Sequence, residues 1–399
     1  MFLSIGVLAG IVGALLSLML EWPGLALSAP MIRGAADAHV PVLIFFAALP
    51  ATLGGLGAIA APSSVGARGS ALPRLEYVGL VLFAASLLAL LAAIFSPGVA
   101  VIAVSVNLLA FSTVLTGASL VVTVLNRSAL PYRAVPFGGW SWLIAGAFAV
   151  CAAPVAAASF TMQLFSGVTP RAACDTSAWP ALAVILCVLL GVVTDLLRPR
   201  LKGRVIALLA SLLGAGMLAV FMGWSVSVLD GNRTTMVGPA IHALFLLMIA
   251  PFVVAWVPGL GGVASMTREE RLAALFAGGM ALLLPLGLTL EVLGVARHEA
   301  ISLAVVFGLF AGVFRAKSRG PWRLIAVMLV EAQFGLLLAA SLAVLLPVSP
   351  FLKSVGAATA ALSIGVFAAG LLADSFGALR RSLAASRPAA SSMAAGQIP

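Results

Sequence analysis

The sequence has 399 residues, of which 63% are hydrophobic and only 9% are charged. Because a soluble domain carries about 25% charged residues, this composition excludes a soluble globular protein and places most of the chain in lipid. The net charge of +10 does not indicate nucleic-acid binding, since the basic residues alternate with apolar stretches, and three cysteines without a C-x-x-C pair support neither a zinc site nor a disulfide framework.

Apolar stretches long enough to span a membrane follow one another along the chain. A bilayer core about 30 Å thick needs roughly 20 apolar residues per helix. Twelve stretches meet this need, over residues 2–20, 37–61, 76–96, 98–125, 138–166, 178–197, 204–229, 237–258, 271–294, 297–314, 323–347 and 352–377. We therefore predict an all-α integral membrane protein with twelve transmembrane helices.

Nothing in the sequence divides these stretches into separate domains. We predict a single transmembrane domain over residues 1–380 and a polar tail over 381–399, which we expect to be disordered because small polar residues bury little apolar surface. The first stretch, Phe2–Leu20, has no basic segment before it and no clear A-x-A site close behind it. We interpret it as a retained first span rather than a cleaved signal peptide.

The distribution of Lys and Arg predicts the orientation of the chain. With the N-terminus inside, 17 of the 22 Lys and Arg residues fall in inner loops and the C-terminal tail, and five fall on the outer side. Cytoplasmic loops of membrane proteins carry this excess of positive charge. We therefore expect both termini to be cytoplasmic.

All three histidines are predicted near the outer face, at similar depth. His39 opens the second stretch, His242 lies in the first turns of the eighth, and His298 opens the tenth. Two imidazoles from different helices at one level can ligate a metal or a haem iron from opposite sides. On these residues alone, the alternative of hydrogen bonding at the interface is favoured, because polar side chains are common near helix ends.

Two polar residues fall well inside the eleventh stretch. Glu331 and Gln333 lie where polar groups are costly and often functional. We expect them to bond to a neighbouring helix, with a proton or quinol site as the alternative.

Three segments resemble a known family, subunit I of the haem–copper oxidases. "AHVPVLIFFAALPATLGGLGAIAAP" is similar to the second helix of that family, and "HEAISLAVVFGLFAG" is similar to its tenth. Its fourth and fifth helices, with the turn between them, resemble "SVNLLAFSTVLTGASLVVTVLNRSALPYRAVPFGGWSWLIAGAFAVCAAPVAAASFTMQLF". The segments occur in the family's order, and twelve helices is the family's number. The resemblance implies a subunit I-like helical bundle.

The resemblance also implies a cofactor. His39 and His298 fall on the two axial ligands of the family's low-spin haem, so the ligand interpretation becomes preferable to the interfacial one, with the haem type left open. His242 matches no family ligand and is expected to form a hydrogen bond at the interface.

The ligands of the oxygen-reducing centre are replaced in this sequence. Ala296 stands where the family has its high-spin haem ligand, and Gly223 and Trp224 stand where it has the paired copper-binding histidines. The segment 177–200, which resembles the sixth helix, has neither His nor Tyr. We expect no copper and no active oxidase.

The low-spin site itself departs from the family's pattern. The family's arginine near this haem falls at about Glu21, and the arginine pair after the eleventh helix is missing from "LLPVSPFLKS". Losing such charge-assisted contacts weakens haem binding. Arg33, Arg297 or Lys353 are candidate substitutes.

Three functions fit these features. The preferred one is a low-spin bis-histidine haem electron-transfer subunit in the inner membrane of a bacterium, with other membrane subunits and a redox donor at the outer face as partners. The alternative, favoured by the missing arginines, is a haem-free structural or assembly subunit of a respiratory complex. A small-solute transporter is third, because the sequence shows no pair of broken helices meeting at the midplane.

Overall fold

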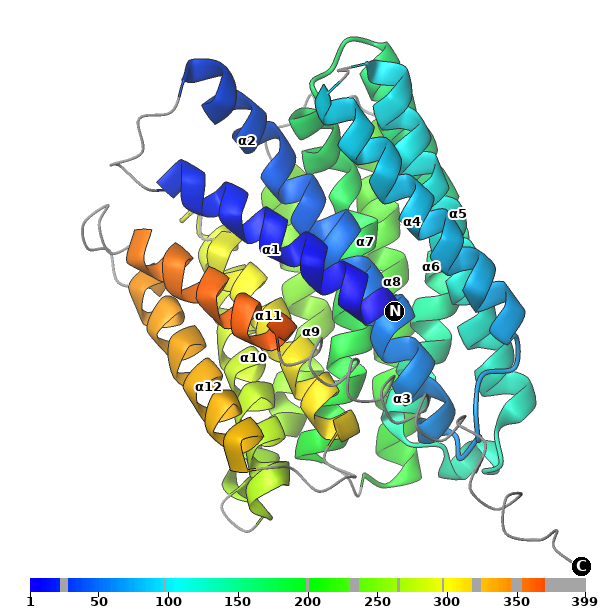
Figure 1. The fold of residues 1–399 in the computed structure, drawn as a ribbon. Coiled ribbons are helices and arrows are strands. Elements are labelled where there is room, and N and C mark those ends of the chain that lie inside the picture. The colour runs from blue at the N-terminus through cyan, green and yellow to red at the C-terminus, as the bar shows by residue number, and fades with distance from the viewer. Residues whose placement is uncertain are drawn as a thin grey trace, which may run out of the picture.

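The computed structural model describes residues 1–21, 28–95, 98–198, 201–229, 237–263, 266–295, 298–317, 324–345 and 354–369. Within these ranges the regular structure is entirely helical (Figure 1). The helices are α1 (Phe2–Glu21), α2 (Ala29–Pro41), η1 (Val42–Ala48), η2 (Pro50–Leu56), α3 (Gly57–Ser64), α4 (Pro73–Phe95), α5 (Val99–Arg127), η3 (Tyr132–Ala134), α6 (Phe137–Phe165), α7 (Pro170–Leu197), α8 (Gly203–Leu229), α9 (Val237–Gly261), α10 (Arg268–Val292), α11 (His298–Lys317) and α12 (Leu324–Leu345). A further helix covers Ser354–Ala369.

The helices agree with the predicted apolar stretches. Among the described residues, nine helices are long and apolar enough to cross a membrane, from Phe2–Leu20 to Glu270–Val292. α11, α12 and the helix Ser354–Ala369 occupy the last three predicted stretches. The prediction of an all-helical, multi-span membrane bundle is confirmed, whereas the proposed tail over 381–399 lies outside the described residues.

Successive helices run in opposite directions, so the two ends of the bundle differ. We call the end at which α2, α7, α9 and α11 begin the histidine end, because the three histidines belong to helices that begin there. His242 lies in the first turns of α9, His298 is the first residue of α11, and His39 lies in the last turn of α2, before η1. The opposite end is called the arginine end, since Arg127, Arg198 and Arg268 lie at helix termini there. All three histidines therefore belong to one end, as predicted.

α7 forms the centre of the bundle. Of the residues in its apolar span, 83% are buried, compared with 17% for α4. Ala183–Leu190 are almost completely inaccessible, and α7 packs against α2, α6, α8, α9, α10 and α11. A helix that is apolar on every face is stable only inside such a shell.

Hydrogen bonds at the arginine end connect the last turns of α7 to its neighbours. The amide N–H of Gly138 donates to Asp195 Oδ1 at 3.1 Å, and Trp256 Nε1 donates to Thr194 Oγ1 at 2.9 Å. These bonds connect α7 to the start of α6 and to the last turns of α9. Since a hydrogen bond is worth most where water is excluded, they hold the three helices in register.

Small residues let α5 and α6 approach closely. A Cβ atom added at Gly117 would lie 2.8 Å from the carbonyl oxygen of Gly146, and one added at Gly146 would lie 2.7 Å from that of Gly117. Close backbone approach through small residues is a common way for helices to pack in lipid, where the hydrophobic effect does not drive them together.

Candidate functional site

His39 lies in the last turn of α2, immediately before the helix changes its geometry. Its Nδ1 lies 3.0 Å from the carbonyl oxygen of Ala36 and 3.3 Å from that of Ala35. A carbonyl oxygen only accepts, so this contact places the ring hydrogen on Nδ1 and leaves the lone pair on Nε2. A histidine that ligates a metal commonly holds its other ring nitrogen in this way.

The helix below His39 is irregular. Two π-helical segments, η1 directly after Pro41 and η2 beginning at Pro50, continue the same span into α3. Proline provides no N–H for the helical ladder, and π-helical insertions change which residues share a helix face. The sequence predicted this span from hydrophobicity alone, so the irregular segments were missed, although the two prolines were a usable signal.

His298 is the first residue of α11, after a turn in which Gly294 takes φ +76°. The predicted ligand side chain of His298 lies outside the described part of the chain. Its backbone lies at the histidine end, shortly after the end of α10.

α11 and the α2–α3 span run side by side in the same direction (Figure 1). A Cβ atom added at Gly312 on α11 would lie 2.8 Å from Leu56 Cδ1 on η2, so the two helices touch there. His39 precedes Leu56 by 17 residues, most of them π-helical, and His298 precedes Gly312 by 14 residues of α-helix. α2 and α11 both pack against α7, whereas the main contacts of α11 with the His39-bearing span fall on η2 and α3, toward the arginine end. The two helices that carry the predicted ligands thus share α7 as a neighbour.

His242 has different surroundings from those expected. It is 6% exposed, and its Nε2 lies 4.0 Å from Oε2 of Glu291, which is 7% exposed. The ring of Trp179 packs edge-to-face against the imidazole, with centroids 4.8 Å apart. His242 is therefore a buried member of a contact between α7, α9 and α10, and the interfacial hydrogen bond expected of it stays a prediction.

Gly223 and Trp224, at which the resemblance predicts the loss of copper ligands, have apolar surroundings. Trp224 is 1% exposed and packs against Phe221, and a Cβ atom at Gly223 would lie 2.9 Å from Leu244 Cδ1. Within the described ranges, no group of three or more His, Cys, Asp or Glu side chains is placed to hold a metal ion. Neither position offers a donor atom to copper.

The two polar residues of α12 have partners on other helices. Arg268, the first residue of α10, binds Glu331 through Nη2 and Nε at 2.7 and 3.2 Å. Gln333 Nε2 donates to the carbonyl oxygen of Ser363, and Ser363 Oγ donates to that of Gln333. The prediction that this pair bonds to neighbouring helices is confirmed, and Glu331 lies close to the arginine end rather than at the midplane.

The fold and this arrangement define a multi-pass integral membrane protein with a histidine-bearing end. Residues 1–191 match the family described as Cytochrome C and Quinol oxidase polypeptide I. This part of the chain is therefore similar to subunit I of the cytochrome c and quinol oxidases. The matched residues include α1 to most of α7 and contain His39, whereas His298 lies beyond them.

Proposed function

We propose that this protein is an electron-transfer subunit that binds one low-spin haem between His39 and His298 and lacks an oxygen-reducing haem–copper centre. The observation that carries the proposal is the hydrogen bond of His39 Nδ1 to the backbone of its own helix. It fixes the tautomer that presents Nε2 to a metal.

The donor set suits a haem iron. His39 and His298 would each hold the iron of a haem through one imidazole, and a haem held in this way would leave no position for O₂. When bound, the haem supplies a one-electron redox couple. The role of this chain is to hold the ring of His39 in one orientation and to keep the site in the low-dielectric shell formed by α1, α7 and α11.

The absence of an oxygen-reducing centre is part of the proposal. It is supported by Ala296, Gly223 and Trp224 at the ligand positions and by the apolar packing around Trp224. The subunit would then pass its electron to another subunit or redox partner. We place the histidine end at the outer face of a bacterial inner membrane, with both termini cytoplasmic, on the distribution of Lys and Arg.

A haem-free structural or assembly subunit is the second candidate. The observation that favours it is the loss of the family's propionate-binding arginines, with Glu21 at one position and "LLPVSPFLKS" at the other. The candidate substitutes Arg33, Arg297 and Lys353 have side chains outside the described residues. A carboxylate-bearing cofactor without cationic partners is bound less tightly.

A reduced-minus-oxidised absorption spectrum of the purified protein tests the proposal. We expect low-spin haem bands in the wild type and their loss in His298→Ala and His39→Ala. His242→Gln is the matched control, because it removes the third histidine and should leave the bands in place. A wild-type protein with no haem absorbance, in a complex that assembles normally, would establish the haem-free alternative.

A further inference from the structure

Two ionisable side chains from different helices meet in the interior at the histidine end. His242 lies in the first turns of α9 and Glu291 in the last turn of α10. Both are buried, and His242 Nε2 lies 4.0 Å from Glu291 Oε2. Ionisable groups inside a membrane-spanning bundle are costly, and where they occur they commonly pair with one another and serve a function. Neither residue is a candidate haem ligand, so the haem proposal does not explain this pair.

The pair is enclosed by aromatic and apolar side chains. Trp179 of α7 packs against His242 and against Phe245, with ring centroids 4.8 and 6.0 Å apart. On α10, Leu288 is completely buried one turn before Glu291. Because such surroundings have a low dielectric constant, a charge gained or lost here changes the energy of the contact more than it would in water.

The contact has few described titratable neighbours. The helices packed against α9 are α7, α8 and α10. In the turns of these helices that reach the histidine end, the described titratable side chains are Glu291 and the buried thiol of Cys174 on α7. The side chains of Arg171 and Asp175, also on α7, lie outside the described residues. Among the described groups, His242 and Glu291 are therefore the two that face each other across this contact.

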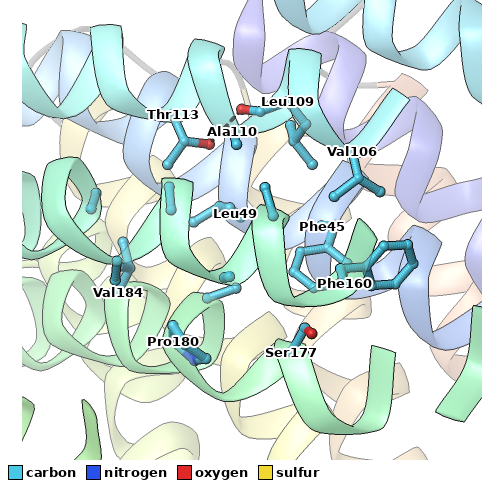
Figure 2. Close-up of a pocket in the computed structure, with 16 residues that line it drawn as sticks. Phe45, Leu49, Val106, Leu109, Ala110, Thr113, Phe160, Ser177, Pro180 and Val184 are labelled. Carbon is cyan, nitrogen blue, oxygen red and sulfur yellow. Dashed lines mark hydrogen bonds between the residues drawn. The ribbon is translucent and has the colours of Figure 1, made fainter. Parts of the chain in front are cut away.

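Another face of α7 lines an interior cavity that has no titratable lining residue (Figure 2). The cavity has a volume of about 40 Å³ and lies between η1, α5, α6 and α7. Its polar lining consists of the hydroxyl groups of Thr113 and Ser177, and Ser177 is two residues from Trp179 on α7. A serine or threonine hydroxyl does not change its charge, whereas an imidazole does. A proton can therefore be bound on the Trp179 side of α7 but not in this cavity.

The pair lies next to the turn between α10 and α11. α10 ends at Val292, and Leu293 is 70% exposed. The amide of Gly294 donates to the carbonyl oxygen of Glu291 at 3.0 Å, so the turn is bonded to the residue that carries the carboxylate. Because lipid-exposed turns do not occur within the hydrocarbon of a bilayer, this turn places Glu291 within one helical turn of the aqueous phase at the histidine end.

Protonation changes what the contact can do. At 4.0 Å the two atoms are too far apart for a hydrogen bond. A proton taken from water adds to the imidazole, whose Nε2–H then faces a carboxylate that keeps its negative charge. Opposite charges draw the two groups toward a charge-assisted hydrogen bond of about 2.7–2.9 Å. We propose that His242 and Glu291 form a proton-binding site whose occupancy tightens the contact between α9 and α10.

Trp179 is the reporter of this site, because its ring lies against the imidazole. The experiment measures the tryptophan fluorescence of the full-length protein in nanodiscs, and the Trp179→Phe variant supplies the signal of the other tryptophans. A charged imidazole quenches a neighbouring indole more than a neutral imidazole does. We therefore expect the Trp179 emission to fall in a single step as the pH is lowered from about 8 to about 5.

Three variants locate the proton. His242→Gln should abolish the step. Glu291→Gln should move its midpoint to lower pH by about 1–3 pH units, since the amide no longer attracts the imidazolium. Glu331→Gln makes the same change in the exposed carboxylate at the arginine end, so it is the matched control and should titrate as the wild type does.

The absence of a step in the wild type, a step that survives in His242→Gln, or an unchanged midpoint in Glu291→Gln would overturn the proposal. Glu291→Gln preserves the shape of the side chain, so the midpoints can be compared even if His242→Gln does not fold. The readout is independent of the haem bands, so this proposal and the haem proposal can fail separately.

Discussion

His39 and His242 lie at the same end of one bundle but in opposite surroundings. The imidazole of His39 is half-buried, and its hydrogen bonds among the described residues are to carbonyl groups of its own helix. That of His242 is buried against a carboxylate and an indole from two other helices. The first arrangement leaves a nitrogen available to a ligand-binding partner, whereas the second uses the ring to join helices. The difference shows that depth in the membrane does not by itself identify a haem ligand.

Replacing His39 should have the largest effect. His39→Ala removes an axial ligand, so we expect complete loss of the low-spin haem spectrum, with a folded protein because the side chain is only half-buried. The spectrum and the elution profile in detergent measure the two effects. Retention of an unchanged six-coordinate spectrum in His39→Ala would exclude this histidine as a ligand.

Replacing His242 should instead reduce stability. His242→Ala leaves Glu291 in a buried position without the imidazole, and removing one partner of a buried pair costs about 3 kcal/mol. Thermal unfolding in detergent measures the loss, and the His242→Ala/Glu291→Ala double variant should recover part of it. If the single variant loses haem at unchanged stability, His242 belongs to the redox site and the contrast with His39 is wrong.

The contact between η2 and α11 controls how the two ligand-bearing helices lie together. Gly312→Ala places a methyl group 2.8 Å from Leu56 Cδ1, so we expect a loss of about 1–2 kcal/mol in stability and a lower haem content. Gly214→Ala on α8, where a Cβ atom meets nothing within 4 Å, is the control and should be neutral or stabilising by about 0.5 kcal/mol. The haem content per protein and the thermal unfolding of each variant measure the difference between them. Equal stability and equal haem content in the two variants would show that this contact does not control how the two helices lie together.

Replacing Glu331 should have the smallest effect on stability. Glu331 forms an exposed pair with Arg268, with side-chain exposures of 44% and 60%. Exposed ion pairs contribute about 0–1 kcal/mol, so Glu331→Gln should change stability by less than about 0.5 kcal/mol and leave haem content unchanged. Thermal unfolding at low and high salt measures this. A loss as large as that of His242→Ala would show that exposure does not separate the two carboxylates.

Hydrophobicity predicted the fold well because length and apolarity decide which segments can cross a bilayer. Every predicted stretch contains a helix, while several boundaries moved: α7 begins at Pro170 rather than 178, since Thr169 accepts a hydrogen bond from the amide of Ala172 and proline suits the first turn. Helix ends depend on such local capping, which hydropathy does not measure.

The candidate site was only partly predictable. Alternation of the helices placed the histidines at one end, but the surroundings of His242 depend on Trp179 and Glu291, which tertiary packing brings from distant parts of the chain. The backbone contact of His39 depends on a side-chain rotamer. The π-helical segments below it depend on how α1 packs, with Gly6 and Gly13 against residues of η1 and its neighbours.

The buried, apolar α7 makes the bundle an electrical insulator between its two faces. A charge gained at the histidine end changes the potential there, and the low-dielectric interior along Ala183–Leu190 is apolar apart from the thiol of Cys187, which donates to the carbonyl oxygen of Ser141. An electron that enters a redox centre at that end from the same side would therefore cross little of the transmembrane voltage. Its midpoint potential should follow the ionic conditions of its own face and be almost indifferent to those of the other.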